Sequence, residues 1–161
     1  MVAAQPTVTQ IWDWLKEIAD PEIPVLSVVD LGIVRDVRWS EDEGELIVTI
    51  TPTYSGCPAM EVIAADIKVV MKEHGIDRLR LETKLSPAWT TDWMTEEAKE
   101  RLRTYGIAPP PSLVSIRDAA VTCPQCGSNA TELVSRFGST PCKALYKCRS
   151  CLEPFDVFKR H

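Results

Sequence analysis

Two C-x-x-C pairs near the C-terminal end place the strongest constraint on what this chain can fold into. Cys123 and Cys126 form the first pair, Cys148 and Cys151 form the second, and 21 residues separate them. Two thiolates at this spacing can face one ion, so the pattern predicts a four-cysteine site for structural zinc. Iron is the rival, because it also accepts four thiolates. In either case four protein ligands close the site and leave no position for a substrate.

The residues around these cysteines predict a zinc-ribbon minidomain over residues 123–161. Thr131 to Phe137 and Lys143 to Lys147 are expected to form a hairpin, with Phe155 to Phe158 as a third strand. Gly127 follows the first cysteine pair and can supply the left-handed backbone that turns amides toward sulfur. Because so small a piece cannot fold alone, metal binding is expected to contribute on the order of 10 kcal/mol to its folding.

Cys142 is the cysteine of this region that lies outside both pairs. If the chain from Cys142 to Cys148 is an extended strand, its steps of about 3.3 Å place the two residues roughly 20 Å apart, too far to share one ion. Two interpretations of Cys142 remain open. It is either a small buried side chain, which is common for free cysteine, or an exposed thiol that meets a partner or a transient cluster.

The preceding part of the chain predicts an α+β fold with the element order α-β-β-α-β-α. Apolar residues recur at helical spacing in three segments and at strand spacing in three others. The expected elements are helices over Val8 to Ile18, Pro58 to His74 and Thr95 to Tyr105, and strands over Ile33 to Trp39, Glu45 to Thr51 and Arg78 to Thr83. This order favours a small two-layer α/β sandwich, with the helices on one face of a three-stranded mixed sheet.

A proline-rich stretch suggests the domain boundary. Ala108-Pro109-Pro110-Pro111-Ser112 interrupts the periodic patterns. Consecutive prolines favour an extended polyproline II conformation and cannot continue a helix. We therefore expect an α/β domain over residues 1–107, a linker over residues 108–122 and the ribbon over residues 123–161.

Charge and composition narrow the classes of partner and location. Of the net charge of −5, residues 123–161 account for +3 and residues 1–122 for −8. Phosphate binding depends on clustered cations, so the acidic body disfavours nucleic acid as a partner. No apolar run approaches the roughly 20 residues of a membrane span, and residues 1–7 lack the features of an export signal. We therefore expect a cytoplasmic protein without a membrane partner, whose cysteines are thiols or metal ligands.

Cys57 stands between a predicted strand and a predicted helix, in the segment Thr51-Pro-Thr-Tyr-Ser-Gly-Cys57-Pro. The helix dipole and the free amides at a helix start favour a thiolate, which raises the nucleophilicity and metal affinity of the sulfur. Thr53, Ser55 and Gly56, immediately before the helix, also resemble a cradle for an anion or ligand. The alternative is a buried structural cysteine.

Three acidic residues flank an apolar stretch ahead of the first predicted strand: Asp20, Glu22 and Asp30. Such carboxylates can bind a cation or position a thiol. The alternative is that they end a helix, close turns and solvate the surface. Neither histidine of the chain pairs obviously with Cys57, so no catalytic triad and no catalytic residue is expected.

Three ordered motifs resemble the iron–sulfur-cluster-assembly domain of SufT-like proteins. They are the segment from Asp20 to Val34, the segment from Thr51 to Pro58, and Pro87-Ala-Trp89. The C-terminal segment, with Cys123-Pro-Gln-Cys126-Gly and Phe137-Gly-Ser-Thr-Pro-Cys142-Lys-Ala-Leu-Tyr-Lys-Cys148, resembles the PaaD family of the phenylacetyl-CoA epoxidase (ring 1,2-epoxidase) system. Together these matches cover nearly the whole chain.

The resemblance implies a non-catalytic accessory protein of aerobic phenylacetate degradation, which matures or inserts the iron–sulfur or iron centre of the epoxidase complex. Its implied partners are components of that complex. Carried over by position, Cys57 is the reactive or cluster-handling thiol, and the supporting loop residues are Asp20, Glu22, Asp30, Thr53, Ser55 and Gly56. Since one thiolate cannot hold a cluster, further ligands would come from a second chain, a homodimer mate or Cys142. The alternative is a structural or regulatory subunit with no role in cluster handling.

Overall fold

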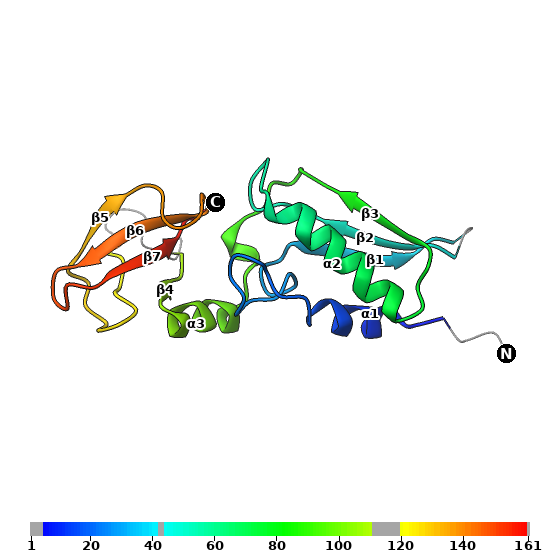
Figure 1. Cartoon of the computed structure of the whole chain (residues 1–161), viewed down its shortest axis with the longest axis horizontal. Coiled ribbons are helices and arrows are strands. Elements are labelled where there is room, and N and C mark those ends of the chain that lie inside the picture. The colour runs from blue at the N-terminus through cyan, green and yellow to red at the C-terminus, as the bar shows by residue number, and fades with distance from the viewer. Residues whose placement is uncertain (1–4, 42–43, 111–119, 161) are drawn as a thin grey trace. The chain divides into compact units, whose positions relative to one another are not determined.

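The computed structural model describes residues 5–41, 44–110 and 120–160. The chain divides into two compact units, Met1–Trp89 and Thr90–His161 (Figure 1). Among the described residues, the first unit contains a three-stranded sheet with two helices, and the second a four-stranded sheet with one α-helix. This confirms the predicted α+β class. No described helix combines the length and apolar character needed to cross a bilayer.

The first helix, α1 (Val8–Leu15), begins where the sequence predicts. The Thr7 side chain accepts a hydrogen bond from the Gln10 backbone N–H at 3.3 Å, and the Gln10 side chain accepts one from the Thr7 N–H at 2.9 Å. This capping box satisfies two amides that the helix leaves unpaired. The helix ends earlier than predicted because the backbone tightens, with the Ile18 N–H donating to the Leu15 carbonyl.

The sheet of the first unit is mixed, as predicted. Strand β1 (Val34–Trp39) runs antiparallel to β2 (Leu46–Ile50), and β2 runs parallel to β3 (Leu79–Thr83), in the order β1-β2-β3. Every residue of the central strand β2 is buried. Because β2 and β3 are parallel, their carboxyl ends meet at one edge of the sheet, and the segments that follow these two strands start there.

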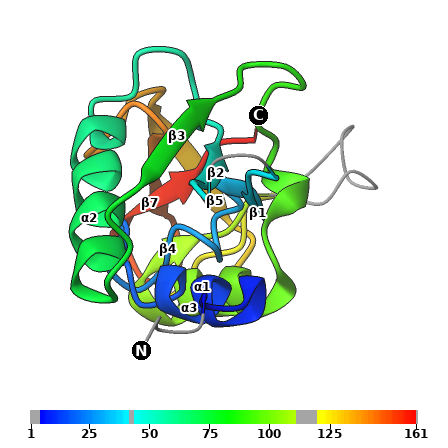
Figure 2. The same cartoon turned by 90° about the vertical axis from the view of Figure 1, so that its right-hand side faces the viewer.

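Helices α1 and α2 (Ala59–Glu73) lie on the same face of this sheet (Figures 1 and 2). The buried residues of α2 recur every four positions: Ala59, Ile63, Ile67 and Met71. Residues at this spacing form one apolar stripe along a helix, and this stripe is the buried face of α2.

The second unit contains the three predicted ribbon strands and one strand that was not predicted. Strands β5 (Thr131–Ser135), β6 (Lys143–Cys148) and β7 (Pro154–Phe158) are antiparallel neighbours, and β4 (Ile107–Ala108) adds to β7 in parallel. The order is β4-β7-β6-β5, so β5 forms one edge of the sheet.

The compact units divide earlier than the boundary expected at residue 107. A short 3-10 turn, η1 (Thr91–Trp93), and helix α3 (Glu96–Tyr105) belong to the second unit, so the first sheet carries two helices rather than three. The reason is local: Gly106, at φ +95°, ends α3 and turns the chain directly into β4, which pairs with β7. Of the expected linker, Ala108 lies in β4, and residues 111–119 lie outside the described residues.

Candidate metal centre and the Cys57 loop

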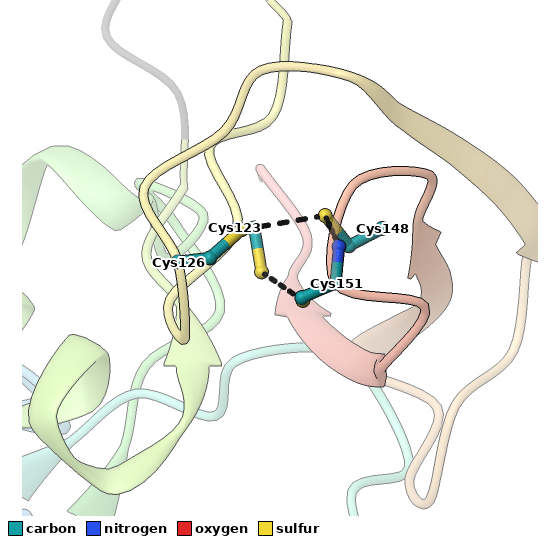
Figure 3. A group of neighbouring side chains, drawn as sticks. All are labelled: Cys123, Cys126, Cys148 and Cys151. Atoms are coloured by element: carbon teal, nitrogen blue, oxygen red, sulfur yellow. Dashed lines mark hydrogen bonds between the residues drawn. The ribbon is translucent and has the colours of Figure 1, made fainter.

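The four paired cysteines of the second unit bring their sulfurs together (Figure 3). The Sγ atoms of Cys123 and Cys151 lie 3.8 Å apart, those of Cys126 and Cys148 lie 3.6 Å apart, and all four lie within 4.8 Å of one another. Sulfurs placed tetrahedrally about 2.3 Å from one ion are about 3.8 Å apart, whereas a disulfide needs about 2.0 Å. The geometry therefore fits four thiolates around one metal ion.

The backbone following each cysteine pair takes the same left-handed conformation. Gly127, after the first pair, has φ +73°, and Leu152, after the second, has φ +66°. The Gly127 N–H donates to the Cys123 carbonyl at 2.9 Å, which closes the first turn. The expectation for Gly127 is confirmed. The left-handed conformation of Leu152 was not predicted, although Leu152 follows its C-x-x-C pair directly, as Gly127 follows the first pair.

Backbone amides of the second pair point at sulfur. The N–H groups of Cys151 and Ser150 donate to the Cys148 Sγ at 3.5 and 3.4 Å. These two donors, Cys151 first, lower the pKa of Cys148 to about 6, even though burial opposes the shift. The Cys148 sulfur is thereby prepared as a thiolate ligand.

The pKa of Cys151 shifts in the opposite direction to that of Cys148. The Glu153 N–H lowers its pKa, but burial and the neighbouring sulfurs outweigh that donor and raise the pKa to about 12. The two shifts belong to a coupled pair, because ionising one sulfur makes it harder to ionise the next. A bound cation would offset this repulsion, so metal binding favours the thiolate forms of Cys148 and Cys151.

A small apolar cluster lies against the cysteine quartet. Its buried members are Ala108, Cys123, Cys148, Phe155 and Val157. Ala108 comes from β4, so the segment just after α3 contributes to the same core as two of the ligands. Metal binding at the quartet is therefore expected to add to the stability of this limited core.

Cys142 lies outside the group of four and is buried, with 4% of its surface exposed. Its Sγ is 3.0 Å from the Thr140 hydroxyl oxygen, and its carbonyl accepts a hydrogen bond from the Lys159 N–H at 2.9 Å. Of the two interpretations of Cys142, the structure matches the buried side chain and not the exposed thiol.

In the first unit, the three segments singled out by their motifs meet at one edge of the sheet. The Thr51 N–H donates to the Ile33 carbonyl at 2.8 Å, which joins the second motif to the first. The buried Trp89 indole Nε1–H donates to the Leu31 carbonyl at 2.8 Å, which joins the third motif to the first. This is the edge where the parallel strands β2 and β3 end. The positions of the three motifs along the sequence did not indicate that the segments meet in the fold.

Cys57 lies at this edge, directly before Pro58, the N-cap residue of α2. Its side chain is partly exposed, and its N–H donates to the Tyr54 carbonyl at 3.2 Å. Gly56 is exposed at φ +87°, and an added Cβ would meet no heavy atom within 4 Å, so glycine is needed here for its backbone conformation and not for space. Thr53 is half-buried and Ser55 is exposed. Cys57 is therefore neither fully buried nor fully exposed in this loop.

The acidic residues near this edge close turns. The Asp20 Oδ1 accepts hydrogen bonds from the backbone N–H groups of Glu22 and Ile23 at 2.9 and 2.8 Å. The Asp30 Oδ2 accepts from both the backbone N–H and the hydroxyl of Ser27, each at 2.9 Å. These contacts agree with the turn-forming interpretation of the carboxylates.

Cys57 does not form a complete metal site by itself. Within the ranges that the structure describes, the cysteine quartet is the group of three or more His, Cys, Asp or Glu side chains close enough to share an ion, and Cys57 is outside it. The described residues therefore contain one complete set of sulfur ligands and, apart from it, a partly exposed cysteine, Cys57, without such a set.

Two family models match the chain, one for each unit. The model described as "PaaD zinc beta ribbon domain" matches residues 108–159. The model described as "Iron-sulfur cluster assembly protein" matches residues 9–75. The first match contains the cysteine quartet, and the second contains Cys57.

Individual proteins show the same two similarities. An Escherichia coli (strain K12) protein described as a putative subunit of 1,2-phenylacetyl-CoA epoxidase is 52% identical over 158 residues, which are 97% of this chain and 94% of that protein. A Staphylococcus aureus (strain USA300) protein described as "Fe-S protein maturation auxiliary factor SufT" is 36% identical over 83 residues, 51% of this chain and 92% of that protein. A crystal structure of a domain of unknown function, DUF59, from Bacillus anthracis has a TM-score of 0.53 and 28% identity, covering 58% of this chain and 89% of that one.

Proposed function

The chain belongs to the PaaD family, which joins an iron–sulfur-assembly domain to a PaaD zinc ribbon, and from this premise we propose its function. It is a non-catalytic accessory protein that matures or inserts the iron–sulfur or iron centre of the phenylacetyl-CoA epoxidase in aerobic phenylacetate degradation. The iron or cluster is its cargo, and Cys57 is the residue that handles it.

The observation that carries this proposal is the exposure of Cys57 at the meeting point of the three motif segments. The Thr51 and Trp89 hydrogen bonds join the three segments, and the Cys57 N–H donates to the Tyr54 carbonyl, so the backbone that carries this partly exposed residue is anchored at the sheet edge. A fixed, accessible sulfur suits temporary ligation, whereas the closed quartet of the ribbon does not exchange a ligand without opening.

The number of available ligands makes this handling transient. Cys57 supplies one sulfur, and an iron–sulfur cluster is held by several protein ligands. The remaining ligands come from the client protein or from a second copy of this chain. Transfer is then a ligand exchange: a client thiolate forms a bond to iron as the bond to the Cys57 sulfur breaks, with no change in oxidation state.

In the ribbon, zinc is the metal we propose for Cys123, Cys126, Cys148 and Cys151. Zinc accepts four thiolates tetrahedrally, and the sulfur spacing of 3.6 to 3.8 Å fits its bond length. Zinc has no redox chemistry, so its contribution there is to hold the second unit in its fold.

Anaerobic reconstitution with iron and sulfide tests this function. The wild-type chain should bind iron and develop a visible absorption band, and Cys57→Ser should lose that band while keeping one zinc per chain. Cys142→Ser is the matched control, because this thiol is buried, and it should behave as wild type. A wild-type chain that takes up no iron, alone or mixed with the epoxidase, would overturn the proposal.

A second function, that of a structural or regulatory epoxidase subunit, is favoured by one observation. The carboxylates of Asp20 and Asp30 accept hydrogen bonds from backbone amides of their own turns, so both side chains stabilise the fold. If the chain only binds its partners, Cys57→Ser should leave ring epoxidation in cells unchanged. If it matures the centre, the same variant should lower both epoxidation and the iron content of the purified epoxidase.

A further inference from the structure

The edge strand of the ribbon exposes apolar side chains over a short stretch of sequence. Leu133, Val134 and Phe137, named here the β5 edge, have 49%, 56% and 68% of their surfaces exposed. Single exposed apolar residues are ordinary, but a group at a sheet edge is typical of a surface that meets another molecule.

A β-bulge determines how this edge can be recognised. The pairing of β5 with β6 shifts register between Leu133 and Ser135, so Val134 is an extra residue in the edge strand. Bulges disrupt the regular row of backbone groups that an added strand requires. The β5 edge is therefore suited to contact through its side chains and not to extension of the sheet by a partner strand.

Phe137 is held in a rigid turn. Its N–H donates to the Ser135 hydroxyl at 3.1 Å, and the next residue, Gly138, donates its N–H to the Lys143 carbonyl at 2.8 Å. A Cβ at Gly138 would collide with the end of the Asp156 side chain and lie 3.2 Å from the Lys143 Cβ, so a larger residue would fit there only if its neighbours moved. The Lys159 ammonium lies 4.4 Å from the centroid of the Phe137 ring, and a side chain restrained before binding loses less entropy on binding.

The charges beside this edge favour an acidic partner. Arg136 and Lys147 are exposed, and neither forms an ion pair with any residue that the structure describes. Two other cations of the ribbon are already paired, Lys143 with Asp156 and Arg149 with Glu132. Residues 123–161 also carry a net charge of +3. Unpaired cations around apolar side chains are complementary to an apolar patch with acidic residues at its rim.

We propose that the β5 edge is the surface by which the ribbon docks on a protein partner, and that the partner presents an apolar patch rimmed by Asp and Glu. This rests on the proposed function and identifies the partner as the epoxidase. The chemistry favours protein over single-stranded nucleic acid, because two of the three exposed side chains, Leu133 and Val134, are aliphatic and cannot stack on bases as Phe137 can, and the whole chain carries a charge of −5.

Binding of the full-length, zinc-loaded chain to purified 1,2-phenylacetyl-CoA epoxidase, assembled without its own PaaD-family component, tests the docking surface. Biolayer interferometry should show binding that weakens as salt rises. The double variant Val134→Ser/Phe137→Ser and the charge reversal Arg136→Glu should each weaken affinity by about tenfold or more, the second with a smaller salt dependence. Val69→Ser, which removes a side chain 53% exposed on α2, is the matched control and should bind as wild type.

Several outcomes would overturn this inference. They are a wild-type chain that does not bind the epoxidase, β5-edge variants that bind as tightly as wild type, self-association governed by the same residues, and tighter binding to a single-stranded oligonucleotide. Zinc content and thermal melting of each variant separate lost docking from lost folding. Cys57→Ser separates the two proposals, because it should dock normally. If it also loads the epoxidase normally, the cargo function fails while docking stands.

Discussion

The four cysteines of the ribbon and Cys57 of the first unit hold sulfur in opposite ways. The quartet completes its ligand set within one chain, and amides directed at Cys148 prepare that sulfur for a cation. Cys57 is held by a backbone whose contacts are satisfied without any metal, and its thiol remains partly exposed. Under the proposed function, a metal is part of the fold at the quartet, where all ligands are present, and is cargo at Cys57, where the remaining ligands come from another chain.

The largest effect that separates the two sites is loss of the ribbon metal. A strong chelator, or Cys148→Ser, should unfold the second unit, because structural zinc contributes on the order of 10 kcal/mol. Hydrogen exchange should show loss of protection in α3 and β4 together with the ribbon strands, since Ala108 lies in the same core. Protection in α2 and β2 should be unchanged. A ribbon that stays protected after metal removal would contradict the contrast between the sites.

A second prediction concerns the support of the Cys57 edge. Trp89→Phe removes the indole donor to the buried Leu31 carbonyl and should lower the free energy of unfolding of the first unit by about 1 to 3 kcal/mol. Chemical denaturation measures the loss, and zinc content reports on the ribbon. If the substitution releases zinc, the two units are less independent than their compact division indicates.

A third prediction uses the matched left-handed residues of the two cysteine turns. Gly127→Ala should destabilise the ribbon by about 1 kcal/mol through backbone strain alone, because an added Cβ meets nothing within 4 Å. Leu152→Gly should relieve the same strain and stabilise it by up to about 1 kcal/mol. Zinc competition with a colorimetric chelator should rank Leu152→Gly above wild type and wild type above Gly127→Ala. The reverse order would show that Leu152 makes a stabilising contact.

The smallest expected effect is on stability at Cys57 itself. Cys57→Ser should change the free energy of unfolding by less than about 0.5 kcal/mol, because the side chain is partly exposed and its loop is held by backbone hydrogen bonds. Urea denaturation of both proteins measures the difference. A loss of about 2 kcal/mol or more would return Cys57 to the class of structural cysteines.

Local signals in the sequence were sufficient to predict most of the fold. Thr7 begins α1, Gly106 ends α3, and alternation in Leu46, Val48 and Ile50 marks the central strand. The cysteine spacing predicted the quartet, since ligands three positions apart in a C-x-x-C pair are positioned by local geometry.

Features that depend on tertiary pairing were beyond such signals. Strand β4 is only two residues long and has no period, so nothing before Gly106 indicates that α3 belongs with the ribbon. Cys142 is buried next to Thr140 and bonded through its carbonyl to Lys159, and the contact with Lys159, 17 positions away, forms only in the folded ribbon. Whether Asp20 is a ligand or closes a turn is likewise decided by backbone amides that composition does not locate.

The joint between the two units lies at Trp89 and Thr90, because the chain enters the ribbon sheet at β4 and the proline-rich stretch begins within the second unit. Trp89 is buried in the first unit, and the Thr90 hydroxyl accepts the Asp92 N–H in the second, so both sides of the joint are anchored. If the ribbon docks the client as proposed, one chain carries both the docked client and Cys57. Linked binding sites typically act at effective concentrations in the millimolar range, so a weak affinity of Cys57 for its cargo would then be enough for transfer.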